Sequence, residues 1–128
     1  HPGALRLGDA VFCGTGGWLS PQDPYFEPLD RPRYMRELAA WEQALTAGRA
    51  LAEGGPCHAL IHFSPFTSIG LPTAFSELLQ RHPAHSVTFG HFHMPKEWAK
   101  APKGEHDGTR YVLASCDCLA FTPVKVAD

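Results

Sequence analysis

Three short, largely apolar runs constrain the fold of this chain more than any other sequence feature. They lie at residues 10–13, 57–63 and 86–89, and glycine, proline or polar residues flank each of them. Runs of this length and composition are typical of strands that are buried on both faces of a sheet. The stretches between them have helical character, so strands and helices alternate along the chain. This order predicts parallel strands joined by helical crossovers, and therefore an α/β fold.

The longest helix is predicted between the first two runs. Asp30 is a candidate N-cap, Pro32 stands where a first-turn proline is tolerated, and two glycines and a proline after Glu53 end the pattern. The face expected to be buried carries residues spaced three or four apart: Tyr34, Leu38, Trp41, Leu45, Gly48 and Ala52. A second helix is predicted over about residues 72–81. Its expected buried side carries Phe75, Leu78 and Leu79.

Outside these elements the patterns are shorter. The proline-rich stretch 19–33 predicts an extended loop. After residue 93, short runs at 97–99 and 111–114 predict two strands around a turn at residues 107–108. Residues 118–126 predict a last strand. These C-terminal strands are expected to be antiparallel in character.

Composition and charge exclude several classes of protein. The 128 residues carry a formal net charge of -2 with 44% hydrophobic and 19% charged residues, which predicts one soluble globular domain over residues 1–128. No basic patch favours nucleic acid or an anionic membrane surface as a partner. No apolar run approaches the ~20 residues of a membrane-spanning helix. The first residues do not resemble a signal peptide and lack a start methionine, so we expect a chain that begins after processing, cleavage or trimming.

The cysteines are expected to be reduced thiols in a cytoplasmic protein, because no secretion signal precedes them. They are Cys13, Cys57, Cys116 and Cys118. The Cys-x-Cys at 116–118 lacks a second pair at the spacing of a zinc ribbon, so packing is the favoured interpretation and a soft-metal site the alternative.

Histidines follow two of the predicted strands. A Gly-His-x-His sequence at residues 90–93 comes directly after the third run, and His62 ends the second. Because the carboxyl ends of parallel strands meet at one edge of a sheet, we expect His62, His91 and His93 to converge there. Three imidazoles in one place predict a metal site. His58, at the opposite end of its strand, is expected to be a hydrogen-bonded or surface residue.

The Gly-His-x-His sequence, with Ile-His-Phe-Ser-Pro at residues 61–65, resembles the second half of the calcineurin-like metallophosphoesterase family. Gly-Thr-Gly-Gly-Trp at 14–18, the helix start at 34–38 and the stretch 111–121 resemble a bacterial subgroup of predicted phosphohydrolases. The resemblance covers residues 11–126. It implies the C-terminal half of a layered α/β/β/α sandwich, with a mixed sheet and two main helices.

The resemblance also implies a two-metal site. Two divalent ions (manganese, iron or zinc) would hold a phosphate ester and activate a bridging water for in-line attack. His62 and His91 would bind one ion, and His93 the other. The glycine-rich loop makes Gly16 and Gly17 candidate substrate-binding positions, because glycine lets backbone approach a ligand closely.

The sequence departs from the family in ways that predict an incomplete site. The family's first half supplies Asp-x-His, Gly-Asp and Gly-Asn-His-Asp or Gly-Asn-His-Glu, but no Asp-x-His occurs here and the chain contains no asparagine. Gly8-Asp9 is interpreted as a turn. Gly16 stands where the subgroup carries arginine, so a phosphate clamp is lost. Catalytic residues are therefore not assigned within this chain.

We accordingly expect a phosphomonoesterase or phosphodiesterase in the intact domain, and a chain that is inactive without the missing N-terminal half. The missing strands would leave apolar surface and sheet edge exposed, so self-association is expected. Two other interpretations stay open. One is a non-enzymatic metal- or partner-binding α/β domain that uses the three histidines. The other is a small α/β interaction domain in which the histidines have no joint role.

Overall fold

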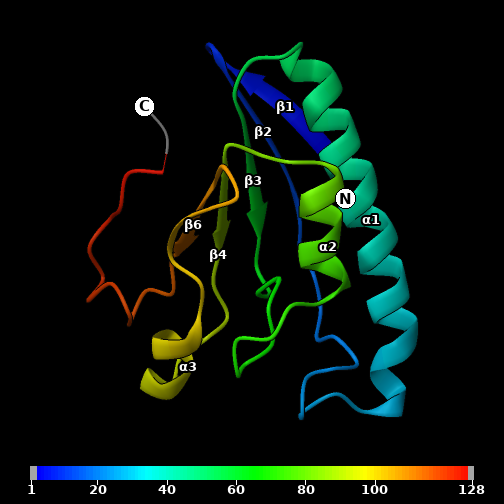
Figure 1. The fold of residues 1–128 in the computed structure, drawn as a ribbon, viewed down its shortest axis with the longest axis vertical. Helices are drawn as coiled ribbons and strands as arrows, with labels where there is room; N and C mark the ends of the chain where they lie inside the picture. The colour runs from blue at the N-terminus through cyan, green and yellow to red at the C-terminus, as the bar shows by residue number, and fades with distance from the viewer. Residues whose placement is uncertain (1–2, 127–128) are drawn as a thin grey trace.

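A computed structural model describes residues 3–126, and they form one mixed six-stranded sheet with three α-helices (Figure 1). The strands are β1 (Gly3–Leu7), β2 (Ala10–Thr15), β3 (Cys57–Ile61), β4 (Ser86–Phe89), β5 (Gly104–His106) and β6 (Thr109–Leu113). Their order across the sheet is β1-β2-β3-β4-β6-β5. The central strands β2, β3, β4 and β6 are parallel, and the two outer strands run antiparallel to their neighbours. The predicted α/β class is confirmed, and the outermost residues of the predicted 1–128 domain lie outside the described part.

The helices are α1 (Arg31–Ala52), α2 (Ala74–Arg81) and α3 (Pro95–Lys100), with a 3-10 turn η1 (Pro28–Asp30) before α1. Helices α1 and α2 lie side by side on the same face of the sheet, on the right in Figure 1. The core forms between this face and the two helices, where the largest fully buried side chains include Trp41, Phe75 and Phe89. Among the described residues, no helix combines the length and apolar character needed to cross a membrane.

Helix α1 follows its predicted pattern closely. Tyr34, Trp41, Leu45, Gly48 and Ala52 are all buried, as the spacing predicted. The helix begins at Arg31, so the predicted loop 19–33 was too long by three residues. Asp30 is the N-cap residue, as predicted, but its side chain makes no cap hydrogen bond. Its carboxylate instead accepts hydrogen bonds from Trp18 Nε1 at 3.0 Å and from the backbone N–H of Glu27 at 2.8 Å.

Strand β1 has no counterpart among the predicted elements. Four of its five residues are exposed, so it lacks the buried alternation by which a strand is recognised. It is an edge strand that pairs with β2 through the predicted turn at Gly8-Asp9, where Gly8 has a φ of +59°.

Two predicted strands near the C-terminus were wrong. Residues 97–99 belong to α3, which begins with a proline at its first position and in which Glu97 accepts a hydrogen bond from Met94 N at 3.2 Å. The turn at residues 107–108 is confirmed, but β6 pairs there with β5. Residues 118–121 form turns with positive φ at Ala120 and Phe121, and no strand follows them in the described chain. The expected antiparallel tail is thus only partly present, since β6 runs parallel to β4.

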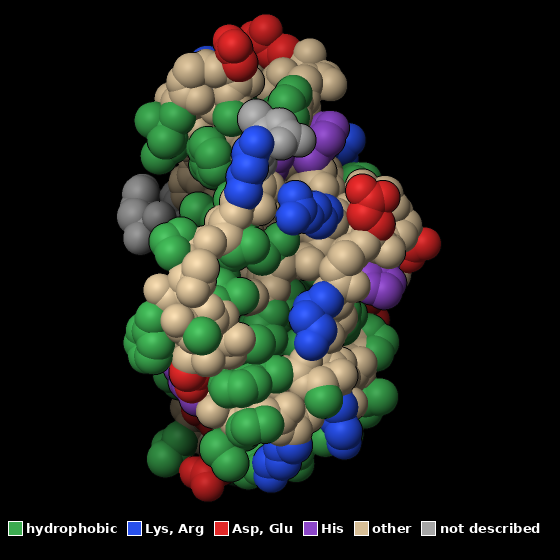
Figure 2. Space-filling view, turned by 90° about the vertical axis from the view of Figure 1, so that its left-hand side faces the viewer, with side chains coloured by type: hydrophobic (Ala, Val, Ile, Leu, Met, Phe, Trp, Pro, Cys, Tyr) green, Lys and Arg blue, Asp and Glu red, His purple; other side chains and the backbone are tan. Residues whose placement is uncertain are grey.

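The face of the sheet opposite α1 and α2 is only partly covered. Leu5 pairs with Phe12, and Leu60 pairs with Thr88, so these side chains lie together on it. Leu5 is 51% exposed and Leu60 is 42% exposed, although both are apolar. Figure 2 shows hydrophobic side chains gathered on this side of the molecule. One face of the sheet is therefore packed and the other is partly open.

Gly48 is a point of close approach between α1 and the sheet. A Cβ atom placed there would lie 2.8 Å from Cys57 Sγ and 2.9 Å from Cys13 Sγ. These two thiols are buried and 3.7 Å apart, and the hydrogen bond with Cys57, together with burial, raises the pKa of Cys13. All four cysteines are free, in accord with the predicted reduced thiols.

We predict that Gly48→Ala lowers the free energy of unfolding by about 1–3 kcal/mol, because overpacking outweighs the better helix propensity of alanine. Ala50→Ser is the matched control on the exposed side of α1 and should change stability by less than about 0.5 kcal/mol. Urea denaturation followed by circular dichroism measures both. A Gly48→Ala variant as stable as the unmodified chain would contradict this close packing.

His58 lies where its neutral form is favoured over its charged form. It is buried, and its Nδ1 lies 2.8 Å from Ser86 Oγ, as expected for a hydrogen-bonded histidine. Burial, and then the neighbouring His85, lower its pKa below the ordinary value. The unfolded chain therefore takes up a proton more readily than the folded chain as the pH falls through about 6.5.

We predict that the melting temperature falls as the pH is lowered from 7.5 to 5.5, and that His58→Gln makes this dependence shallower. Glutamine keeps a hydrogen-bonding partner for Ser86 but does not titrate. Thermal scans at a series of pH values measure the slopes. Equal slopes for the two proteins would show that His58 does not contribute.

Candidate metal centre

His62 and His91 meet at the carboxyl ends of two adjacent parallel strands. His62 follows β3 directly, and Gly90 and His91 follow β4. A hydrogen bond of 3.0 Å from Gly90 N to His62 O continues the pairing of these strands beyond their ends. The two imidazole rings have centroids 5.4 Å apart and planes at 78°. The structure thus brings together two of the three predicted metal ligands.

The backbone of His91 adopts a conformation that is uncommon outside glycine. Its φ is +71°, in the left-handed region. Its ring stacks on Phe63 with a centroid separation of 4.0 Å and an interplanar angle of 29°. Strained backbone of this kind persists only where the surroundings hold it, and it clusters at functional sites. The stacking against Phe63 gives the His91 ring a defined orientation next to His62.

The environment of His91 favours its neutral form. Burial lowers its pKa, and the nearby His62 lowers it further. A neutral imidazole has a free electron pair on one nitrogen, and this is the form that binds a metal ion. His62 is exposed while His91 is half-buried, so the pair is open to solvent on one side.

His93 is held separately from this pair. Its side chain is 57% exposed, and its Nδ1 lies 3.0 Å and 3.1 Å from the two carboxylate oxygens of Asp117. Desolvation raises the pKa of Asp117, but the hydrogen bond with His93 and one from Cys118 N outweigh it, so the net pKa lies below the ordinary value. Sequence reasoning did not identify Asp117, because the Cys-x-Cys at residues 116–118 was considered only for its two cysteines.

The spacing of His62 and His91 suits two ligands of one metal ion, which form one side, or wall, of a metal site. Imidazole–zinc bonds are about 2.0–2.1 Å long, so two imidazoles on one tetrahedral ion have ring centres about 5 Å apart. The separation of His62 and His91 matches this. Within residues 3–126, however, no group of three or more histidine, cysteine, aspartate or glutamate side chains is arranged to hold an ion. The residues present are therefore compatible with a two-histidine half-site.

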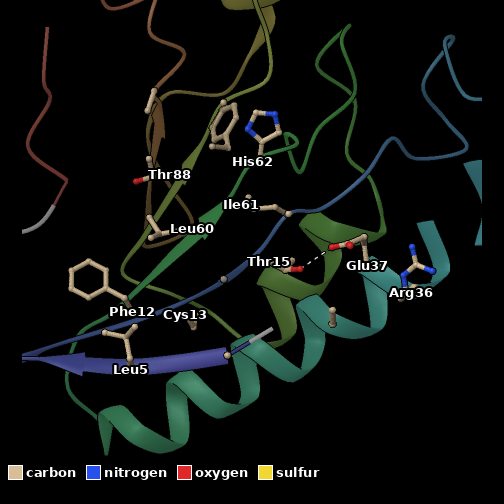
Figure 3. Close-up of a pocket in the computed structure, with 17 residues that line it drawn as sticks. Leu5, Phe12, Cys13, Thr15, Arg36, Glu37, Leu60, Ile61, His62 and Thr88 are labelled. Carbon is tan, nitrogen blue, oxygen red and sulfur yellow. Dashed lines mark hydrogen bonds between the residues drawn. The ribbon is translucent and has the colours of Figure 1, made fainter. Parts of the chain in front are cut away.

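A cavity of about 830 Å³ lies beside His62 (Figure 3). Thr15, Gly16, Glu37 and Leu60 are among the residues that line it. Glu37, from α1, is a further residue that sequence reasoning missed. Its Oε2 accepts a hydrogen bond of 2.8 Å from Thr15 Oγ1, the dashed line in Figure 3, and one of 3.2 Å from Gly17 N.

The two glycines of this loop differ in their surroundings. Gly16 is exposed and lines the cavity, so its backbone is open to a ligand. Gly17 is buried with a φ of +71°, and a Cβ atom there would lie 2.8 Å from Ile61. Because Gly17 N donates to Glu37 in this structure, Gly16 is the more accessible of the two predicted substrate-binding positions.

Comparisons of the chain with protein-family models, with curated proteins and with solved structures found no match. Its function is therefore inferred from its residues and their geometry.

Proposed function

We propose that this chain supplies the histidine wall of a two-metal site, and that the intact domain is a metal-dependent phosphoesterase. The observation that supports this most directly is the 5.4 Å separation of the His62 and His91 rings at the ends of neighbouring parallel strands. The reaction class comes from the resemblance of residues 61–65 and 90–93 to the metallophosphoesterase pattern. The cavity beside His62 gives a phosphate ester room next to this wall.

In this proposal, His62 and His91 bind one divalent ion and His93 binds a second. When bound, such ions polarise a phosphate ester and lower the pKa of a water molecule for in-line attack. Manganese, iron and zinc all suit imidazole and carboxylate ligands. The residues of this chain orient the site: Phe63 fixes the plane of the His91 ring, and Gly16 lets the chain approach the substrate closely.

The opposite wall would come from the N-terminal half of the domain. Carboxylates and an asparagine amide are required there, and the chain has no asparagine at all. The partly open face of the sheet, with Leu5 and Leu60, suits a second sheet packed about 10 Å away, as in an α/β/β/α sandwich. Without that half, the same apolar face favours self-association.

We predict that the chain binds Zn²⁺ through the histidine pair. His62→Ala and His91→Ala should each lower the affinity at least about tenfold, equivalent to about 1.4 kcal/mol. His85→Ala is the matched control, because this exposed histidine precedes β4 at the opposite end of the same sheet. Isothermal titration calorimetry with reduced protein gives the affinities. If the His62 and His91 variants bind Zn²⁺ as tightly as the control, the metal assignment is wrong.

We also predict that the isolated chain does not hydrolyse a chromogenic phosphate ester in the presence of Mn²⁺. The physical reason is the missing carboxylate wall. A phosphatase with a complete site, assayed in parallel, establishes that the conditions support turnover. Robust hydrolysis that is lost in His91→Ala would show that the chain holds a complete site and would overturn the half-site proposal.

Metal binding without hydrolysis is a second candidate function. It is favoured because no third donor completes a site with the histidine pair among residues 3–126. The two candidates separate once the N-terminal half is supplied. A phosphoesterase gains turnover on addition of that half, whereas a metal-binding domain gains none.

A further inference from the structure

The carboxylate of Asp117 contacts a histidine of the Gly-His-x-His sequence, and among residues 3–126 it is the only acidic side chain hydrogen-bonded to one. Both oxygens lie at 3.0–3.1 Å from the same ring nitrogen, Nδ1 of His93. The two residues are 24 positions apart in the chain, so the contact depends on the tertiary fold. This pairing leaves Nε2, on the other side of the ring, as the nitrogen that can bind a ligand.

The chain after β6 is built so that Asp117 reaches this position. A hydrogen bond of 2.7 Å from Ala114 N to Phe89 O carries the β4–β6 pairing beyond the end of β6. The chain then turns, with Phe121 N donating to Cys116 O at 2.7 Å. Cys118 packs against the hydrophobic core, which anchors the turn. The segment is thereby held at the edge of the sheet that carries the histidines.

The carboxylate itself is also fixed. Cys118 N donates a hydrogen bond of 3.0 Å to Asp117 Oδ1. The side chains of His93 and Asp117 are 57% and 34% exposed, and ion pairs in such positions contribute little to stability. A stabilising role is therefore a poor explanation for a pair whose geometry is so well defined.

We propose that Asp117 is a positioning residue for His93: it accepts the Nδ1–H hydrogen bond, holds the neutral ring in that tautomer, and so presents Nε2 to a divalent metal ion. Metal-binding histidines commonly donate their second ring N–H to a carboxylate, which fixes the tautomer and orients the ring. The free imidazole of histidine prefers the opposite tautomer, with the proton on Nε2. The metal-binding part of this inference rests on the proposed function, whereas the tautomer does not.

The tautomer is measured directly by ¹⁵N NMR of the histidine rings at pH 8. In the unmodified chain we expect His93 to carry its proton on Nδ1. In Asp117→Ala we expect the proton to move predominantly to Nε2. Glu105→Ala, which removes an exposed carboxylate from the neighbouring edge strand β5, should leave the His93 signals unchanged.

The second measurement is a Zn²⁺ titration of the same three proteins. Loss of a carboxylate that orients a metal-binding histidine typically lowers metal affinity about 10–100-fold. We expect a loss of this size for the metal bound through His93 in Asp117→Ala, and less than about twofold change in Glu105→Ala. Circular dichroism spectra of the three proteins should coincide, which excludes unfolding as the cause.

The possible failures are distinguishable. If His93 carries its proton on Nε2 in the unmodified chain, or if Asp117→Ala leaves the tautomer unchanged, the role of Asp117 is overturned whatever the metal data show. If the tautomer changes but Asp117→Ala binds Zn²⁺ as tightly as the unmodified chain, positioning for metal is overturned. If the unmodified chain binds no Zn²⁺, the proposed function fails together with the metal-binding part of this inference, while the tautomer still decides whether Asp117 sets the state of His93.

Discussion

The candidate site depends on the register between β3 and β4. These adjacent parallel strands end together, with Ile61 opposite Phe89, and the hydrogen bond from Gly90 N to His62 O continues their pairing by one further step. A shift of one residue in either strand would turn every side chain to the other face of the sheet. His62 would then no longer face His91. The apolar side chains that set the register also make the core beneath α1 and α2, so the packing of the fold and the geometry of the site have the same origin.

The sequence is informative where burial is periodic. Strands β2, β3 and β4 and helices α1 and α2 all pack on the core, and their apolar spacing identified each of them. Strand β1 and helix α3 were not identified, because β1 is exposed on four of five residues and the run in α3 is too short to show a period. Strand β1 is determined by its pairing at the edge of the sheet, and α3 by the proline and the glutamate in its first turn. Neither of these causes produces a hydrophobic pattern in the sequence.

The same distinction applies to the candidate site. The meeting of His62 and His91 was predictable, since it needs only two parallel neighbours and the rule that their carboxyl ends coincide. Asp117 and Glu37 were not, because each reaches its partner through tertiary contacts across more than twenty positions. The left-handed backbone of His91 is a further feature without a sequence signal, since glycine occupies position 90 and not 91.

Helix α2 connects β3 to β4, so a polypeptide that contains this connection carries both His62 and His91. His62, His91 and the strands that position them all belong to one crossover unit, β3-α2-β4, which is local in sequence. A single crossover connection is therefore enough to place the two histidines side by side. If the carboxylate wall is carried by a separate segment, the two pieces must associate before the site is complete. The rate of turnover would then depend on the concentrations of both pieces, and dilution would lower it. The site would be active only while the segment that carries the carboxylates is bound to the histidine wall.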